Sequence, residues 1–316
     1  MSVWKLSVGT AGAIGIRKLK TDALPTTAYI MLGEKCTRNC AFCAQAREST
    51  AAAKFLSRVA WEETSQDVSI EHLAAAYKTN KIQRACLQIV NRPDSLPEVQ
   101  KAVEALVKAQ VPVVVSGYIT SVAEAKKLFD LGVDRIGLAM DVATPKLFEK
   151  IKGGSWQQRW ELLTSCAAAF PGKMTTHLIV GLGETEEEMW QLIKECYARN
   201  ITVGLFAFTP LPGTAMGNKV QPNIGSYRRL QIAVGLLKRA FSSDVVICRD
   251  GKITGFKVQN VAEVLADGEA FRTTGCHNCN RPFYNERPGQ VLYNYPRALS
   301  AREVEKAFAE SEVITC

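Results

Sequence analysis

The sequence contains no continuous apolar run near the roughly 20 residues that a membrane-spanning helix needs, so no membrane span is expected. No signal peptide is expected, because residues 1–24 mix Lys and Arg with short apolar pieces. The sequence also has no block of like charges, which argues against nucleic-acid binding. We therefore expect a cytoplasmic protein that binds neither membrane nor nucleic acid.

The composition is that of an ordinary globular chain, with 316 residues of which 47% are apolar and 22% are charged. Ten cysteines in a chain without a signal peptide favour metal or redox chemistry over a disulfide framework. The net charge of +8 would help an acidic protein substrate or electron donor to dock. An evenly solvated basic surface is the alternative.

Strand-like and helix-like segments alternate through most of the chain, with no internal repeat and no linker. The expected strands are residues 27–32, 85–90, 111–115, 135–140, 174–180, 203–208, 244–248 and 270–274. Amphipathic segments between them, such as 96–110 and 121–131, predict helices. Seven or eight such units predict an α/β protein with a parallel barrel, a complete or near-complete (β/α)8. The predicted organisation is an N-terminal arm (1–24), the barrel (25–275) and a C-terminal tail (276–316) packed on the barrel mouth.

Three cysteines, Cys36, Cys40 and Cys43, form a CxxxCxxC run directly after the first expected strand. The carboxyl ends of barrel strands are where active sites form, so this loop lies on the active face. Three soft thiolates suit an iron–sulfur cluster, and having only three would leave one iron of a four-iron cluster open. Zinc, the alternative, would need a fourth ligand nearby, and the next cysteine is the distant Cys86.

This spacing, with the aromatic Phe42 before the last cysteine, resembles the cluster motif of the radical S-adenosylmethionine (SAM) enzymes. The resemblance implies a 4Fe-4S cluster whose open iron binds SAM. The stretch from His177 to Thr185 resembles that superfamily's glycine-rich turn, which would place Gly181 and Glu184 in the turn and Ile179 beside the adenine. The alternative is a common strand-to-helix turn.

The order of motifs also resembles biotin synthase over most of residues 27–275. That resemblance implies that Asp141 binds the SAM ribose and Arg159 the SAM carboxylate. From the residues alone, Asp141 could instead cap the next helix, and Arg159 could be a surface arginine.

The departures from biotin synthase argue against biotin formation. Of the second-cluster ligands of that family only Cys86 has a match, and the other places are occupied by Val113, Thr175 and a residue near Ile247. The asparagines that bind its small substrate are replaced by Gly137, Ala139 and Phe206.

A second cysteine pair, Cys276 and Cys279, forms a CxxC in an irregular tail rich in Gly and Pro. Zinc and a redox dithiol are the alternatives to a second cluster. Because an eighth barrel strand would end near Thr274 beside the first, we expect this pair to share the barrel mouth with the first cysteine group. Cys316 is the expected third ligand, and Cys248 is its competitor.

The tail sequence CNRPFYNERP, residues 279–288, resembles the paired, two-protein lipoyl synthase of archaea and some bacteria. The resemblance implies a second 4Fe-4S cluster, held by the catalytic residues Cys276 and Cys279, that serves as the sulfur source. It implies an octanoylated lipoyl carrier protein as substrate, a second lipoyl synthase component as partner, and a ferredoxin- or flavodoxin-type electron donor. The alternatives are a radical SAM enzyme whose auxiliary cluster is not consumed, and a non-catalytic iron–sulfur carrier.

Overall fold

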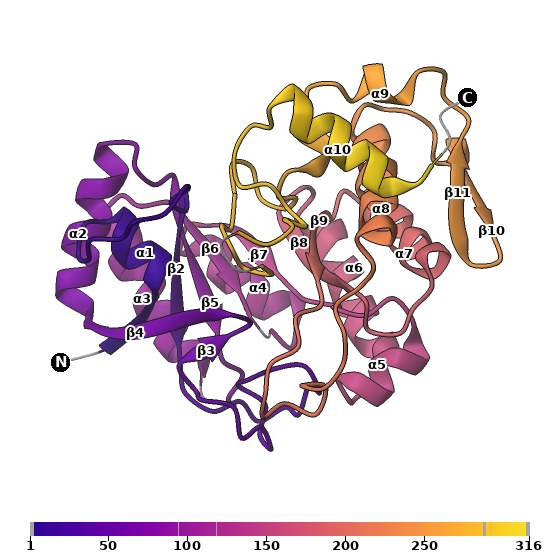
Figure 1. The fold of residues 1–316 in the computed structure, drawn as a ribbon. Coiled ribbons are helices and arrows are strands. Elements are labelled where there is room, and N and C mark those ends of the chain that lie inside the picture. The colour runs from indigo at the N-terminus through magenta and orange to yellow at the C-terminus, as the bar shows by residue number, and fades with distance from the viewer. Residues whose placement is uncertain (1–2, 94, 118, 287–288, 314–316) are drawn as a thin grey trace.

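A curled nine-stranded sheet forms the centre of the computed structural model, which describes residues 3–93, 95–117, 119–286 and 289–313 (Figure 1). The strand order is β3-β4-β1-β2-β5-β6-β7-β8-β9, and every neighbouring pair from β2 to β9 is parallel. The parallel strands are β2 (Thr27–Leu32), β5 (Arg84–Ile89), β6 (Val113–Ser116), β7 (Val133–Gly137), β8 (Met174–Val180) and β9 (Thr202–Ala207). They form a half-barrel, so the expected α/β barrel class is confirmed.

Helices between successive strands cover the outer face of the half-barrel. They are α2 (Gln66–Lys78), α3 (Ser95–Lys108), α4 (Val122–Asp130), α5 (Pro145–Ile151), α6 (Trp156–Ala169), α7 (Glu186–Ala198) and α8 (Ile224–Lys238). Side chains cap several helix starts: Ser121 accepts a bond from the Glu124 N–H, and Thr185 forms a capping box with Glu188. The helices bury strand residues such as Ile30 and Leu87 completely.

The expected seventh and eighth barrel strands are absent from the half-barrel in the described residues. Residues 244–248 fall in a short 3-10 helix, η1 (Ser243–Val245), and in β10 (Val246–Arg249), which pairs antiparallel with β11 (Lys252–Phe256) in a separate sheet. The reason is the Asp250-Gly251 turn: both residues have positive φ, as a tight hairpin requires, and the chain folds back on itself. Residues 269–271 form η2 (Glu269–Phe271), which follows Gly268 with φ of 71°.

The N-terminal residues extend the sheet with antiparallel strands. β1 (Val3–Ser7) lies between β2 and β4 (Val59–Ser65), and β3 (Phe55–Leu56) pairs with the outer edge of β4. A short helix, α1 (Val8–Ala13), follows β1 within the stretch that was predicted as an N-terminal arm. Trp4 and Leu6 are fully buried, so this stretch belongs to the core of the sheet.

The C-terminal part packs against α8. After the short helix α9 (Val261–Val264), α10 (Ala301–Ser311) lies along α8 (Figure 1), where Arg228 Nε contacts Glu310 at 2.9 Å. Arg229 Nη1 donates to the Ser311 carbonyl at 2.7 Å. Cys316 lies outside the described residues. Within the described part of the chain, no helix combines the length and the apolar character that a membrane crossing demands.

Candidate iron–sulfur and SAM site

The loop that carries Cys36, Cys40 and Cys43 follows the carboxyl end of β2, as predicted. Its own backbone holds it: the Cys36 N–H donates to the Gln45 carbonyl at 2.9 Å, and the Cys43 N–H donates to Cys40 at 3.0 Å. The loop is also anchored from outside, because the Ala41 N–H donates to Ile151 at the end of α5. Burial raises the pKa of Cys40, and it raises the pKa of Cys43 to about 12. Metal binding at this loop therefore requires the release of protons.

These cysteines line a cavity of about 250 Å³ at the carboxyl ends of the strands, which we call the mouth cavity. It also brings together four of the other predicted site residues: Phe42, Asp141, Arg159 and Ile179. Arg159 is only 8% exposed, so it is not the surface arginine that the sequence allowed. The mouth cavity therefore has an apolar and aromatic wall, one carboxylate and cationic groups. This combination is suited to a ligand that carries both an adenosine and an amino acid.

Asp141 is held in place by a lysine that sequence reasoning missed. Lys152 Nζ donates to Asp141 Oδ2 at 2.6 Å and to the Ala139 carbonyl at 2.7 Å, and both side chains are largely buried. Asp141 does not cap the following helix, because the Thr144 side chain accepts the bond from the Leu147 N–H. The only sequence signal for Lys152 was its place before two glycines, which does not distinguish it from a surface lysine.

The predicted glycine turn has the expected shape but does not line the mouth cavity. Gly181 and Gly183 have positive φ, and a Cβ on Gly181 would come within 2.9 Å of Pro222. The Glu184 carboxylate accepts bonds from the N–H groups of Gly181 and Leu182 at 2.6 and 2.9 Å. Glu184 therefore stabilises the turn itself, next to Ile179, which does line the cavity.

Cys276 and Cys279 lie at the opposite end of the strands from the expected position. The Thr26 N–H, just before β2, donates to Asn280 Oδ1 at 2.9 Å, and Asn278 Nδ2 donates to Gln83, just before β5. Both contacts are at the amino ends of parallel strands. The expectation that this pair shares the barrel mouth is therefore corrected, because residues 270–274 form no strand that would carry the chain to the mouth.

The tail instead runs along the open edge of β9. Thr274 Oγ1 accepts a bond from the Leu205 N–H at 2.8 Å, and Asn285 Nδ2 donates to the Ala207 carbonyl at 2.6 Å. Residues 274–286 thus cover the side of the half-barrel where further strands were expected, running from the amino ends of the strands toward the mouth.

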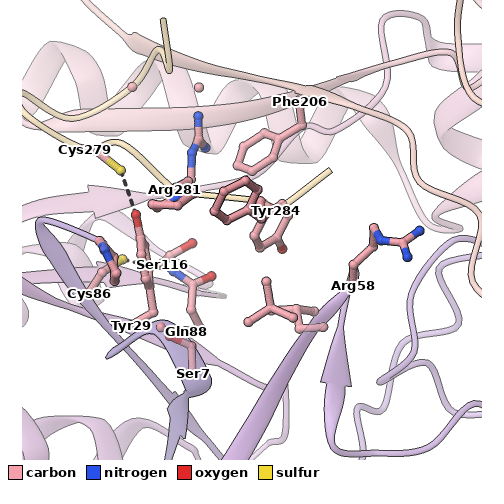
Figure 2. Close-up of a pocket in the computed structure, with 18 of the residues that line it drawn as sticks. Ser7, Tyr29, Arg58, Cys86, Gln88, Ser116, Phe206, Cys279, Arg281 and Tyr284 are labelled. Atoms are coloured by element: carbon pink, nitrogen blue, oxygen red, sulfur yellow. Dashed lines mark hydrogen bonds between the residues drawn. The ribbon is translucent and has the colours of Figure 1, made fainter. Parts of the chain in front are cut away.

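A second cavity of about 400 Å³, the deep cavity, adjoins the mouth cavity. Cys276 and Cys279 line it, and so does Cys86, which stands beside Tyr29 in the pairing of β5 with β2. Tyr29 Oη lies 3.1 Å from Cys279 Sγ, and Figure 2 shows the Cys86 sulfur near the same tyrosine. Cys248 does not line this cavity; it lies on β10, near Glu187 of α7.

Aromatic side chains occupy the boundary between the two cavities. The rings of His177 and Tyr284 flank the Phe206 ring at centroid distances of 5.0 and 5.2 Å, and the Arg281 guanidinium lies 3.8 Å from the Phe206 centroid (Figure 2). Burial and the nearby Arg281 lower the pKa of His177 to about 4, so its imidazole is neutral near pH 7. Sequence reasoning missed His177 because a lone histidine in an apolar strand carries no distinctive signal.

The sequence profile of the radical SAM superfamily matches residues 30–196, which include the cysteine loop, Asp141, Arg159 and Ile179. The chain belongs to the radical SAM superfamily. Membership of this superfamily implies a 4Fe-4S cluster and SAM as cofactors. The mouth cavity fits both, because the three thiols of one loop and the Asp141–Lys152 pair line it.

Individual relatives of this radical SAM chain are distant. A lipoyl synthase of Buchnera aphidicola subsp. Schizaphis graminum is 22% identical over 203 residues, covering 63% of this chain and 58% of the relative. A GTP 3',8-cyclase of Limosilactobacillus fermentum is 21% identical, covering 50% of this chain and 47% of the relative. The chain thus spans about half the length of these curated relatives.

Among solved structures, the FeFe-hydrogenase maturase HydG from Carboxydothermus hydrogenoformans superposes with a TM-score of 0.53 at 15% identity, covering 68% of this chain and 52% of HydG. This similarity concerns the fold.

Proposed function

We propose that the protein inserts sulfur into an unactivated C–H bond of an octanoyl chain that is attached to a lysine of a lipoyl carrier protein. The supporting observation is that the two cysteine-lined cavities adjoin. Both linings include Leu56, Gln88, Ser116, His177, Phe206 and Tyr284. A substrate carbon at this boundary would have SAM on one side and the second cysteine group on the other.

When bound, the reduced first cluster and SAM supply one-electron cleavage to methionine and a 5′-deoxyadenosyl radical, and an auxiliary 4Fe-4S cluster supplies sulfide. In the overall change, one C–H bond of the chain is replaced by one C–S bond. The hydrogen would leave in 5′-deoxyadenosine, the auxiliary cluster would take up the surplus electron, and a ferredoxin- or flavodoxin-type donor would supply the electron that starts each cleavage.

The residues of the chain have separate tasks in this proposal. Cys36, Cys40 and Cys43 hold the first cluster, while Cys276 and Cys279 hold the second. Asp141, fixed by Lys152, accepts hydrogen bonds from the SAM ribose, and Arg159 balances the charge of its carboxylate. The aromatic boundary at Phe206 and Tyr284 excludes water from the reacting carbon.

The proposal includes the partners that the tail sequence suggested: an octanoylated carrier protein and a second lipoyl synthase component. The distant lipoyl synthase relative supports it, although the GTP 3',8-cyclase relative shows that similarity at this level spans different reactions. A cytoplasmic location accords with the cysteines of the described residues, all of which are free thiols that a reducing compartment preserves.

The test is a single-turnover reaction of anaerobically reconstituted protein with SAM, a low-potential reductant and an octanoyl-lysyl peptide. Mass spectrometry should find 5′-deoxyadenosine together with a peptide in which sulfur replaces hydrogen. The Cys276→Ala variant should lose the sulfur product, and Cys248→Ala, a matched control on β10, should keep it. Formation of 5′-deoxyadenosine without sulfur transfer to any octanoyl substrate would instead support another radical SAM reaction, and absence of both products would support a carrier.

A further inference from the structure

The structure assigns Cys86 as the third protein thiolate of the second iron–sulfur cluster, together with Cys276 and Cys279. This assignment rests on the proposed function insofar as that function requires a second cluster. It replaces both Cys316 and Cys248, which sequence reasoning had put forward as the third ligand.

The first argument is position. Cys86, Cys276 and Cys279 line one cavity, although Cys86 lies on β5 and the other two lie in the tail. Figure 2 shows Cys86 and Cys279 in this cavity. No other cysteine in the described ranges lines this cavity, since Cys166 and Cys196 are fully buried on α6 and α7.

The second argument concerns polar groups at the sulfur atoms. Gln88 Nε2 lies 2.9 Å from Cys86 Sγ, and Tyr29 Oη lies 3.1 Å from Cys279 Sγ. Hydrogen bonds to ligand sulfurs are among the means by which proteins tune iron–sulfur clusters. A purely structural thiol in an apolar core would have no need of these polar partners.

The third argument is charge. Three thiolates and a cluster bring negative charge into a buried space, and such charge needs compensation. The Arg281 side chain lines the same cavity as Cys86, Cys276 and Cys279, so the cavity that holds the three thiols also contains a cation.

The test counts iron and acid-labile sulfide after anaerobic reconstitution. The parent protein should hold about eight irons, as two four-iron clusters. Cys86→Ala, Cys276→Ala and Cys279→Ala should each fall to about half of that content, while Cys248→Ala and a protein lacking Cys316 should match the parent. In all three depleted variants, the SAM-induced change in the electron paramagnetic resonance spectrum of the first cluster should persist, which shows that the fold is intact.

Two results would overturn the assignment in different ways. Full iron in Cys86→Ala, with half in Cys276→Ala and Cys279→Ala, would remove Cys86 as a ligand and leave the proposed function standing. Full iron in all three variants would remove the second cluster and the proposed function with it. If Cys86→Ala also loses the signal of the first cluster, the Cys86→Ser variant is measured in its place. About half of the parent's iron content together with an intact signal supports the assignment. The full iron content opposes it.

Discussion

The ammonium of Lys152 lies 2.6 Å from the carboxylate of Asp141, and this buried pair stands in the wall of the mouth cavity. Asp141 has a φ of 64°, and its backbone bonds to His177 and Ile179 of β8 fix this uncommon conformation. Two separate constraints, one on the backbone and one on the side chain, therefore set the direction of a single carboxylate. Such preorganisation is expected of a group that binds a ligand.

Asp141→Asn should weaken SAM binding by roughly ten-fold or more, because a hydrogen bond to a charged group contributes about 1.5–3 kcal/mol. Binding to the reconstituted protein is measured by isothermal titration calorimetry. The variant should also lose stability, because Lys152 is left buried without its charged partner. The double variant Asp141→Asn/Lys152→Met should recover stability but not affinity. Unchanged affinity in both variants would reduce the pair to a structural role.

Replacing Cys36, Cys40 and Cys43 together by Ala should remove about half of the bound iron and abolish formation of 5′-deoxyadenosine. The reason is that these thiols supply the ligands of the cluster at which the superfamily binds SAM. Iron analysis and chromatography of the nucleoside products measure the two effects. Retention of SAM cleavage in the triple variant would contradict the assignment of this loop.

Glu186→Ala should destabilise the protein by about 3–5 kcal/mol, since it removes the close, buried carboxylate partner of Arg229 and leaves only the exposed Glu312 at 4.0 Å. The Arg229 and Glu186 side chains are 4% and 10% exposed, and Glu186 also accepts a bond from the Ile253 N–H. The exposed pair Lys126–Asp130 is the matched control, and Asp130→Ala should cost no more than about 0.5 kcal/mol. Urea denaturation gives both values, and similar costs for the two variants would refute the prediction.

Acidification should destabilise the protein partly through His177. Its pKa of about 4 in the folded state lies below the usual value of 6.5, so the unfolded chain binds more protons between these values. The stabilisation is complete above pH 6.5 and is lost as the pH falls toward 4. Between pH 7 and pH 5 the loss is roughly 2 kcal/mol. Arg281 and Lys152 oppose protonation of the ring, and Asp141 favours it.

The measurement is urea denaturation of the parent and of His177→Gln at pH 7 and pH 5. The variant should show the smaller loss of stability on acidification, because it removes the titrating group. Equal losses in the two proteins would show that other groups account for the acid sensitivity.

Local patterns were enough to predict much of the half-barrel. The strand at 174–180 was placed with the boundaries that the structure has, because the segment is rich in β-branched and apolar residues and ends at Gly181. The cysteine loop was also predicted from sequence, since all three thiols lie within eight residues and need no distant partner. By contrast, the expected seventh strand does not join the half-barrel, because the tight turn at Asp250-Gly251 pairs β10 with the following strand β11.

The sequence by itself determined the class of the fold and predicted the cysteine loop at the mouth, because both depend on residues that are neighbours along the chain. Only the tertiary structure decided which side chains meet in the deep cavity. Cys86 and Cys279 lie far apart in sequence and share that cavity because the tail runs along the open edge of β9 to the amino ends of the strands. The same holds for Lys152, whose buried position depends on how α5 packs beside β7 and β8. Contacts of this kind arise from the path of the whole chain, and no local pattern encodes them.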